Sequence, residues 1–344
     1  MCMNLYRRID RKKVQFDFVK HTSQKGDFEE EITKLGGKVF EAPRYKVYNA
    51  VQYLLWWKKY LLKHPEYQII HGHFFTISAI YFSVAKQLGR KTIGHIHASK
   101  ADGILKKYLV KQITKVTDYP LACSQQAGEW VYGNRPFTVL RNALDTEAFQ
   151  YNETIRGQCR ERLGLLESFA VGTVANYSFV KNPMGLIDIF LYVKKKRPEA
   201  KLLWVGEGGL RNNIEERIHT EKIEDDVLLL GARDDVPELL QAMDAFLLPS
   251  FDEGLPVSAI EAQASGLPCF ISDRVTTETD ITGLCHFLPI EKPDIWAEEI
   301  LKQSITRKDT SEQIKKQGYD IHTTAKWLEE FYLQIEREQG GKTE

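Results

Sequence analysis

Two glutamates eight positions apart flank a Gly-Leu-Pro turn in the segment SFDEGLPVSAIEAQASG, residues 250–266. The preceding residues, DAFLLPS, predict a buried parallel strand, and a helix is predicted from Pro256 to its stop at Gly266. Ligands of open α/β sheets bind at the carboxyl ends of the strands. Because Gly254 leaves the backbone bare, N–H groups near Leu255 can face an anion at the positive end of the helix. The segment therefore predicts a seat for a diphosphate.

The two glutamates of this segment are expected to have different surroundings. Glu253 lies in the loop before the helix, and Glu261 lies about two turns into it, among small alanines. A carboxylate among packed residues is costly unless it accepts hydrogen bonds, and a ribose diol offers two donors. The alternative is that neither glutamate binds a ligand: Glu253 simply lies in the first turn of the helix, and Glu261 faces solvent. The coincidence of strand, loop and small-residue helix favours the binding interpretation.

Three more predicted strand ends carry residues that suit a nucleotide. In VANYSFVKNPMGL, Lys181 comes just before a helix start, where a lysine can stabilise a departing diphosphate. Gly206 opens a glycine turn that would let a nucleotide approach the backbone, although G-x-G-G alone is weak evidence. Arg233 suits a contact to base or phosphate, but a surface ion pair with Asp234 or Asp235 explains it equally well.

Histidines and cysteines raise the question of a metal. His71, His73, His95 and His97 form two H-x-H pairs at the ends of two predicted strands. No acidic partner follows at ligand spacing, so we favour polar contacts lining a cleft, with His97 as the best candidate, and expect no metal. The five cysteines are odd in number and scattered, which predicts free thiols and neither disulfide nor zinc.

From residue 13 onward, short β-rich runs alternate with longer helical runs. Connections too long for hairpins predict parallel sheets covered by helices on both faces. We predict an α/β protein of two doubly wound, Rossmann-like domains facing a cleft, at residues 1–146 and 147–320, with a C-terminal helix and tail at 321–344. A linker is expected near 145–152. The predicted strands are 14–19, 38–41, 68–71, 92–95, 119–122 and 138–141, then 170–175, 201–205, 227–231, 246–249 and 269–272.

The start of the chain departs from this pattern. A doubly wound domain normally opens with a strand and a tight glycine turn, whereas this chain opens on the helical pattern MNLYRRID. We therefore expect the first sheet to lack its first strand, leaving a strand edge uncovered. Lower stability and weak activity follow from that expectation.

The composition limits the classes of partner that the sequence predicts. Lys plus Arg and Asp plus Glu both number 47, so the chain carries no overall field of the kind that attracts nucleic acid. No apolar run approaches the roughly 18 residues that span a bilayer, and the start has no secretory apolar region, which predicts a cytoplasmic protein. Residues 48–64 and 104–115 mix aromatic, aliphatic and lysine residues. Each is either a helix packed on the sheet or a face that rests on anionic lipid at the inner membrane surface.

Together these motifs resemble retaining glycosyltransferases of the GT-B fold, in glycosyltransferase family 4 (group 1), which serve capsule and exopolysaccharide assembly. The resemblance covers nearly the whole chain. Its most specific part is the E-x7-E arrangement within PSFDEGLPVSAIEAQASGLP. It is supported by NLYRRIDRKKVQFDF, EEEITKLGGKVFEAP, IIHGHFF, GHIHAS, ACS, VLRNALDTEAF, VKNP and LLLGARDDVPELLQAMDAFLLPS.

The resemblance implies a role for each matching residue. Glu253 and His97 would lie near the donor sugar, Glu261 would hold the ribose, and Lys181 would contact the diphosphate. The reaction would move a sugar, with a UDP-sugar as the favoured donor, to a glycan or lipid-linked acceptor with retention of anomeric configuration and without a metal or other cofactor. Asn176 stands where the family carries an arginine, so one of two diphosphate cations is absent.

Two alternatives stay open. One is a nucleotide-sugar epimerase on the same architecture, which would need a different acid and base. The other is a non-catalytic remnant that still binds a nucleotide sugar, an interpretation that Asn176 and the expected lack of a first strand support.

Overall fold

The computed structural model describes residues 2–73, 77–97, 104–303 and 306–340, with only the backbone described for 104–109 and 340. The chain divides into two compact units. The first comprises residues 1–144 and 318–344, and the second comprises residues 145–317. The long final helix therefore belongs to the first unit, although it follows the second in sequence.

The first unit is built on parallel strands that fall into two separate sheets. β1 pairs with β2 alone, and β3, β4, β5 and β6 form a second sheet in that order. Within the described residues no strand pairing joins β1 to β3. The strands are β1 (Phe18–Lys20), β2 (Val39–Glu41), β3 (Ile69–Gly72), β4 (Lys91–Ile96), β5 (Tyr119–Ala122) and β6 (Thr138–Val139).

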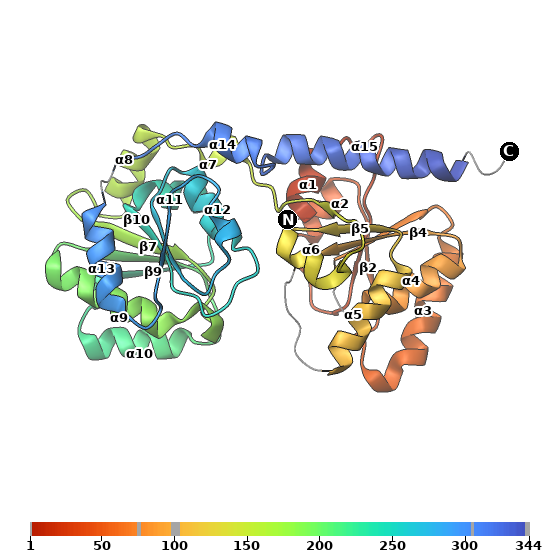
Figure 1. Ribbon diagram of the computed structural model, residues 1–344, viewed down its shortest axis with the longest axis horizontal. Helices are drawn as coiled ribbons and strands as arrows, with labels where there is room; N and C mark the ends of the chain where they lie inside the picture. Colours follow the sequence, from red (N-terminus) through yellow and green to blue (C-terminus); the bar gives the residue numbers. More distant parts are fainter. Residues whose placement is uncertain (1, 74–76, 98–103, 304–305, 341–344) are drawn as a thin grey trace. The chain divides into compact units, whose positions relative to one another are not determined.

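Helices cover both faces of these sheets. Figure 1 shows α1 and α15 along one face and α3, α4 and α5 along the other. Each face has its own apolar core, one packed under α15 and the other under α3 and α4. The helices are α1 (Cys2–Arg8), α2 (Glu29–Lys34), α3 (Ala50–Lys63), α4 (Ser78–Gln87), α5 (Ile104–Val116), α6 (Gln125–Tyr132) and α15 (Ile321–Gly340).

The second unit is a single six-stranded parallel sheet in the order β12-β11-β10-β7-β8-β9. The central strands β8, β10 and β11 are almost wholly buried, because helices cover both faces, and they accordingly read as continuous apolar runs. The edge strands β9 and β12 are only partly buried. The strands are β7 (Ala170–Val174), β8 (Lys201–Val205), β9 (Val227–Gly231), β10 (Ala245–Leu248), β11 (Cys269–Ser272) and β12 (Cys285–Leu288).

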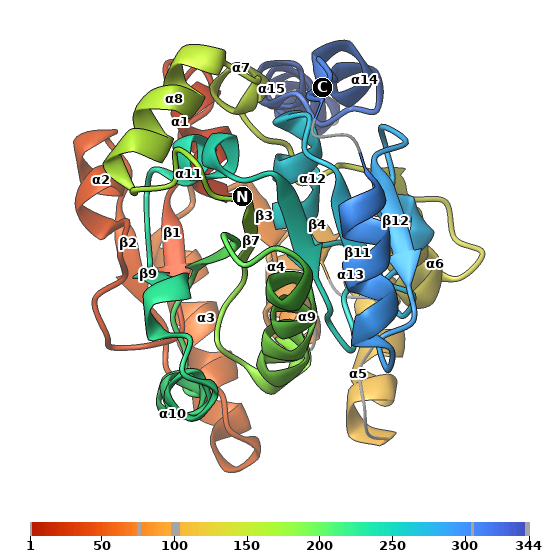
Figure 2. The same ribbon diagram turned by 90° about the vertical axis from the view of Figure 1, so that its left-hand side faces the viewer.

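The helices of this unit pack in two layers. Figure 1 shows α9 and α10 on one side of the sheet and α8, α11 and α12 on the other, and α13 lies beside α9 in Figure 2. The helices are α7 (Thr146–Phe149), α8 (Glu153–Arg162), α9 (Pro183–Lys196), α10 (Arg211–Glu221), α11 (Val236–Ala242), α12 (Val257–Ala264), α13 (Pro293–Lys302) and α14 (Ser311–Lys316).

A buried charge cluster ties α8 to the centre of this sheet. Asp244, just before β10, accepts hydrogen bonds from Arg156 at 2.5 Å, Arg160 at 3.2 Å and the backbone N–H of Ala170 at 2.7 Å. Paired and hydrogen-bonded charges are the form in which buried ions are tolerated. The cluster fixes the start of β10, whose other end carries the predicted site.

Residues 145–152, where a linker is expected, follow the boundary between the two units and hold the short helix α7, and α8 begins directly after them. Asp145 and Asn152 each accept a hydrogen bond from the backbone of the turn that follows, and so cap α7 and α8. No helix among the described residues is both long and apolar enough to cross a membrane.

Candidate functional site

The strand order of the second unit locates a ligand site. From β7 the chain adds β8 and β9 on one side, and it later returns to add β10, β11 and β12 on the other. Parallel α/β sheets bind ligands where the order reverses, outside the carboxyl ends of the strands. Here that point lies between β7 and β10. The loops that follow these two strands carry most of the predicted site residues.

These two loops are joined by their backbones and by an aromatic pair. Phe251 N donates to Val180 O at 2.8 Å, and the rings of Phe179 and Phe251 stack with centroids 5.1 Å apart. Phe179 nevertheless stays 75% exposed. Sequence reasoning missed this pair, although an aromatic residue just after the Pro-Ser that ends a buried strand was a signal.

Lys181 and Glu253 meet across the two loops. The ammonium Nζ of Lys181 donates to carboxylate Oε1 of Glu253, and both side chains are largely buried, at 19% and 13% exposure. Lys181 ends a short 3-10 turn. Asn182 then adopts a left-handed backbone, with φ of 53°, and its side chain accepts from Gly185 N at 3.1 Å to cap α9. The cap thereby fixes where the lysine emerges.

The start of α12 offers free backbone donors. Pro256 is the N-cap and supplies no side-chain acceptor. Among the described residues, the N–H groups of Leu255 and Val257 have no hydrogen-bond acceptor, and Gly254 precedes them without a side chain. Such groups at a helix N-terminus favour an anion. The phosphate site predicted from the sequence stays a prediction.

Glu261 lies on α12 in apolar surroundings. Burial raises the pKa of its carboxyl to about 7 from an ordinary value of 4.5. Its neighbours Ala259, Ala262 and Ala264 are buried, and no described side chain forms an ion pair or hydrogen bond with its carboxylate. A ligand with two hydroxyl donors would supply the missing partners.

The remaining predicted residues of this unit have structural partners. Gly206 follows β8 with φ of 149°, and a Cβ there would lie 2.1 Å from Ala175 O, so its lack of a side chain serves loop packing. Arg233 forms a two-fold ion pair with Asp235 at 2.8 and 2.7 Å, the alternative left open by the sequence. Asn176 Oδ1 accepts from Ser178 Oγ at 2.8 Å.

Ser250 is a further polar group at this position that sequence reasoning did not select. It follows β10 and is fully buried, and its hydroxyl has no hydrogen-bond partner among the described atoms. A buried hydroxyl without a partner is costly. It lies next in sequence to the loop that carries Glu253.

His97 belongs to the first unit, at the carboxyl end of β4. Its Nε2 lies 3.0 Å from Nδ1 of His73, and the rings of His95 and His97 are 4.3 Å apart. Burial lowers the pKa of His97 to about 4 and that of His71 to about 3, so both are neutral at pH 7. A neutral imidazole can donate and accept hydrogen bonds but carries no charge.

The histidines converge more closely than the sequence suggested. The ligand atoms of His71, His73 and His95 lie within 4.8 Å of one another. His95 Nε2 lies 3.1 Å from Leu140 O, and His71 Nδ1 lies 2.5 Å from Tyr332 Oη. Three neutral imidazoles could ligate a metal such as zinc. Hydrogen bonds to Tyr332, His97 and the carbonyl of Leu140 account for the same geometry.

Comparisons with known proteins address both halves of the chain. Residues 1–148 match the model for Glycosyltransferase Family 4, and residues 159–319 match the model for Glycosyl transferases group 1. This chain is a member of the group 1, family 4 glycosyltransferases. The predicted family is thereby confirmed.

Several known proteins align with most of the length of this glycosyltransferase. The putative glycosyltransferase EpsF of Bacillus subtilis is 29% identical over 93% of this chain and 88% of its own length. An Escherichia coli UDP-Gal:alpha-D-GlcNAc-diphosphoundecaprenol alpha-1,3-galactosyltransferase is 29% identical over 62% of this chain and 59% of that protein. The crystal structure of Anabaena HepE with UDP and glucose superposes with a TM-score of 0.76 at 16% identity, covering 92% and 99% of the two chains. That likeness confirms the predicted GT-B fold of two Rossmann-like domains.

Proposed function

We propose that this glycosyltransferase moves a sugar from a nucleotide diphosphate sugar, with a UDP-sugar as the favoured donor, to a glycan or lipid-linked acceptor in polysaccharide biosynthesis. The observation that carries the proposal is the meeting of Lys181 and Glu253 at the strand-order reversal of the second unit. The E. coli relative named for a UDP-Gal donor and the HepE complexes with UDP support this choice of donor.

The chain's own groups account for stabilisation of the leaving diphosphate. Lys181 supplies a cation, and the N–H groups of Leu255 and Val257 supply aligned dipoles, so charge that develops on the departing oxygen is met by groups already in place. Glu261 would accept hydrogen bonds from the ribose. With Asn176 where the family has arginine, the site has one cation fewer, and we propose that these groups act without a metal.

We propose that the anomeric configuration is retained. Glu253 would lie at the donor-sugar end, with its charge balanced by Lys181, and neutral His97 would offer a hydrogen bond to the sugar. The leaving diphosphate would accept the proton from the acceptor hydroxyl as the new glycosidic bond forms. Proton NMR of the first product formed tests retention, because the anomeric coupling constant distinguishes the two outcomes.

Calorimetric titration with UDP, beside an assay of UDP-sugar hydrolysis and transfer, tests the donor assignment. We expect saturable binding of UDP and release of UDP from at least one UDP-sugar. A screen of UDP-sugars and GDP-mannose for protection against thermal unfolding identifies the sugar. Protection by GDP-mannose alone would contradict the UDP assignment, and conversion of a UDP-sugar to its epimer would indicate the epimerase instead.

Asn176 favours a second candidate, a non-catalytic protein that binds nucleotide sugars. With one cation lost, stabilisation of the leaving group falls by a few kcal/mol, or about a hundredfold in rate, unless another group replaces it. Asn176→Arg separates the two. A rise in turnover would support a weakened enzyme, whereas unchanged UDP binding with no turnover in either form would support the binding protein.

We propose that α3 contacts the membrane surface. Its buried side, at Tyr53, Trp57 and Leu61, packs on the unit, while its other side exposes apolar residues. Lysines lie among them, as expected of a helix that rests on anionic lipid. The exposed apolar residues of α3 are Val51 at 72%, Leu54 at 40%, Leu55 at 56% and Leu62 at 59%, and Val47 at 72% and Tyr48 at 82% precede them in a 3-10 turn.

Co-sedimentation with vesicles tests this contact. We expect the protein to bind vesicles that contain phosphatidylglycerol and not neutral phosphatidylcholine vesicles, and Val51→Asp with Leu55→Asp to abolish binding. A paired substitution that adds the same charge on the exposed side of another helix, Asn212→Asp with Asn213→Asp on α10, is the control. Equal binding by the α3 variant would contradict the proposal.

A further inference from the structure

Four histidines of the first unit lie on one face of its sheet, in or just after the neighbouring strands β3 and β4. His71 and His73 are two residues apart, as are His95 and His97, and alternate residues of a strand point to the same face. The parallel register sets His71 opposite Ile93, so His95 comes beside His73, with ring centroids 5.3 Å apart. The sheet therefore gathers imidazoles that are far apart in sequence.

Three of these side chains stand at distances that suit a shared ligand. The rings of His71, His73 and His95 have centroids 4.4 to 5.5 Å apart, and one ligand nitrogen from each lies within 4.8 Å of the others. Nitrogens bound to one tetrahedral zinc ion lie about 3.3 Å apart, given Zn–N bonds of about 2.0–2.1 Å. Rotation of the rings about their side-chain bonds would close this difference.

The hydrogen bond of His95 leaves one of its nitrogens unused. Nε2 lies 3.1 Å from Leu140 O, and a carbonyl oxygen only accepts, so Nε2 carries the proton of the neutral ring. Nδ1 is then a bare acceptor, and it is buried without a hydrogen-bond partner among the described atoms. A backbone carbonyl that fixes the proton on one nitrogen is the arrangement found behind metal-bound histidines.

His71 shows the same arrangement with a different partner. Its Nδ1 lies 2.5 Å from Tyr332 Oη on α15, and its Nε2 is buried without a partner in the described part of the chain. When Nδ1 donates to the phenol oxygen, Nε2 is left as a second bare acceptor. Buried acceptors without donors are costly, and hydrogen bonds to the fold account for only one nitrogen of each of these two rings.

His73 supplies the third position. Its Nδ1 lies 3.0 Å from Nε2 of His97, so that hydrogen bond leaves Nε2 of His73 for a ligand. Burial lowers the pKa of His71 to about 3 and the pKa values of His73 and His95 to well below 6.5, so all three rings are neutral at pH 7. Neutral imidazole is the form of histidine that binds a metal.

A set of three histidines needs no acidic partner. The sequence predicts no metal because no carboxylate follows at ligand spacing, whereas three imidazoles hold zinc in one class of site and leave its fourth position to water. Only the structure shows that the second H-x-H pair contributes a ligand beside the two of the first.

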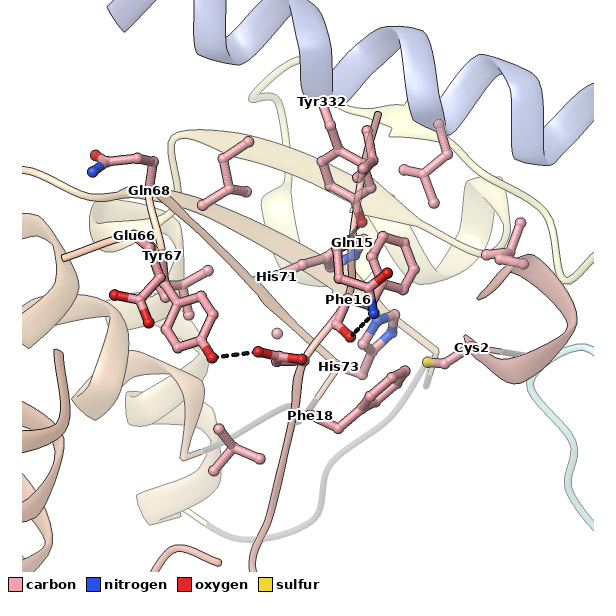
Figure 3. Close-up of a pocket in the computed structure, with 18 of the residues that line it drawn as sticks. Cys2, Gln15, Phe16, Phe18, Glu66, Tyr67, Gln68, His71, His73 and Tyr332 are labelled. Carbon is pink, nitrogen blue, oxygen red and sulfur yellow. Dashed lines mark hydrogen bonds between the residues drawn. The ribbon is translucent and has the colours of Figure 1, made fainter. Parts of the chain in front are cut away.

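A cavity of about 440 Å³ gives an ion access to these nitrogens. His71 and His73 both line it, and Figure 3 shows them at this cavity together with Tyr332. The volume is far larger than the roughly 30 Å³ that one water occupies in the liquid. There is room for a zinc ion to enter and for a water molecule to take the fourth position.

We propose that the first unit binds one zinc ion through Nε2 of His71, Nε2 of His73 and Nδ1 of His95, with water as the fourth ligand. Tyr332 and Leu140 hold the protons of two of these rings on the opposite nitrogens. The proposal does not rest on the proposed function, because the groups assigned to the diphosphate belong to the second unit.

Metal titration of the full chain tests the site. The protein is freed of metal with EDTA and titrated with zinc chloride by calorimetry, and X-ray absorption of the zinc-loaded protein identifies the ligand atoms. We expect one zinc ion per chain, with nitrogen and oxygen ligands at about 2.0–2.1 Å. The absence of saturable binding would overturn the proposal. A ligand at about 2.3 Å would also overturn it, because that distance places the ion on a cysteine sulfur.

Three substitutions give a matched comparison. His73→Gln removes a ligand, Tyr332→Phe removes the acceptor behind His71 and keeps all three rings, and His219→Gln on the exposed surface of α10 is the control. We expect Tyr332→Phe to weaken zinc binding about 10- to 100-fold and His73→Gln to weaken it further, with His219→Gln unchanged. Zinc should raise the midpoint of thermal unfolding of the control but not of His73→Gln.

These variants can contradict the proposal separately. Equal zinc affinity in His73→Gln and His219→Gln would overturn the site. Unchanged affinity in Tyr332→Phe would overturn the role of the hydrogen bond behind His71. The X-ray measurement needs no variant, so it decides the ligands even if His73→Gln fails to fold.

Discussion

Lys181 and Glu253, 72 positions apart in sequence, form an ion pair that joins the loops after β7 and β10. The pair lies where the strand order of the second unit reverses. It places a cation beside a carboxylate. Under the proposed function, a diphosphate bound at Lys181 would share the ammonium with Glu253.

Replacing Lys181 tests the diphosphate contact. Lys181→Met removes a charge-assisted hydrogen bond worth about 1.5–3 kcal/mol, so we expect UDP affinity to fall roughly 10- to 100-fold. Turnover should fall further if the charge matters most in the transition state. Lys195→Met, on the exposed side of α9, is the control and should leave UDP titration unchanged. Equal affinities for both variants would refute the contact.

Replacing Glu253 separates chemistry from nucleotide binding. Glu253→Gln keeps the shape of the side chain and frees Lys181 from its ion pair. We expect UDP to bind at least as tightly, because the freed ammonium can serve the diphosphate fully, while transfer falls by about 100-fold or more. Steady-state kinetics beside calorimetry measures the split. Retained turnover would exclude Glu253 from the donor-sugar end.

Glu261 should make UDP binding depend on pH. Its pKa is raised by burial to about 7, and an ionised carboxylate accepts the ribose hydrogen bonds best. Affinity for UDP should therefore rise as pH increases from 6 to 8. Glu261→Gln should flatten this profile, whereas Glu216→Gln on the surface of α10 should not. A pH-independent affinity in the unaltered protein would contradict the ribose assignment.

The same carboxyl predicts an effect on stability without ligand. Because folding raises its pKa from 4.5 to about 7, the folded state holds the proton more tightly, and stability is lost as pH rises through this range. Glu261→Gln should stabilise the protein at pH 8 by up to about 3 kcal/mol and have no effect near pH 4. Urea unfolding at the two pH values measures the difference.

The histidines of the first unit predict the opposite pH dependence, in which stability falls as the pH falls. Burial lowers the pKa of His71 to about 3 and that of His97 to about 4, so the unfolded chain takes up protons first. Stability is complete above pH 6.5 and is lost as pH falls toward 4. Thermal unfolding at pH 7.5 and 5.5 should show the loss, and His97→Gln should reduce it. Exposed His219→Gln should not.

Two glycines of one loop give a matched test of the packing behind the site. Gly206→Ala would force a Cβ to within 2.1 Å of Ala175 O at a backbone angle that side chains rarely adopt, whereas Gly209 has nothing within 4 Å. We expect Gly206→Ala to destabilise the protein by about 2–4 kcal/mol and Gly209→Ala by less than about 1. Equal midpoints of urea unfolding would contradict this account.

Most of the fold follows from local patterns. The segment around Pro256 becomes α12 with Pro256 as its cap, and Gly266 takes φ of 65° after it, as the stop signal predicts. β12 was missed, because Cys285–Leu288 is a short edge strand that is only partly buried and has no strong apolar run. The helix α8 was missed because most of its residues are polar. It is attached to the sheet by ion pairs of Arg156 and Arg160 with Asp244, which an apolar pattern does not reveal.

The arrangement of the site was harder to predict from the sequence than the fold. Residue types and strand ends identified Lys181, Glu253 and Glu261 separately, but an ion pair over 72 positions depends on strand order, which local pattern does not fix. The partner of Arg233 illustrates the same limit, since only the structure selects Asp235 over a ligand. For Gly206, the close approach of Ala175 gives a reason that the glycine turn alone could not.

A crystal structure of the protein with UDP tests the central claim most directly. The account predicts the ribose hydroxyls on the carboxylate of Glu261 and the diphosphate on Nζ of Lys181 and the N–H groups that start α12. UDP bound away from the ends of β7 and β10, or Glu261 without a contact to the ribose, would contradict it.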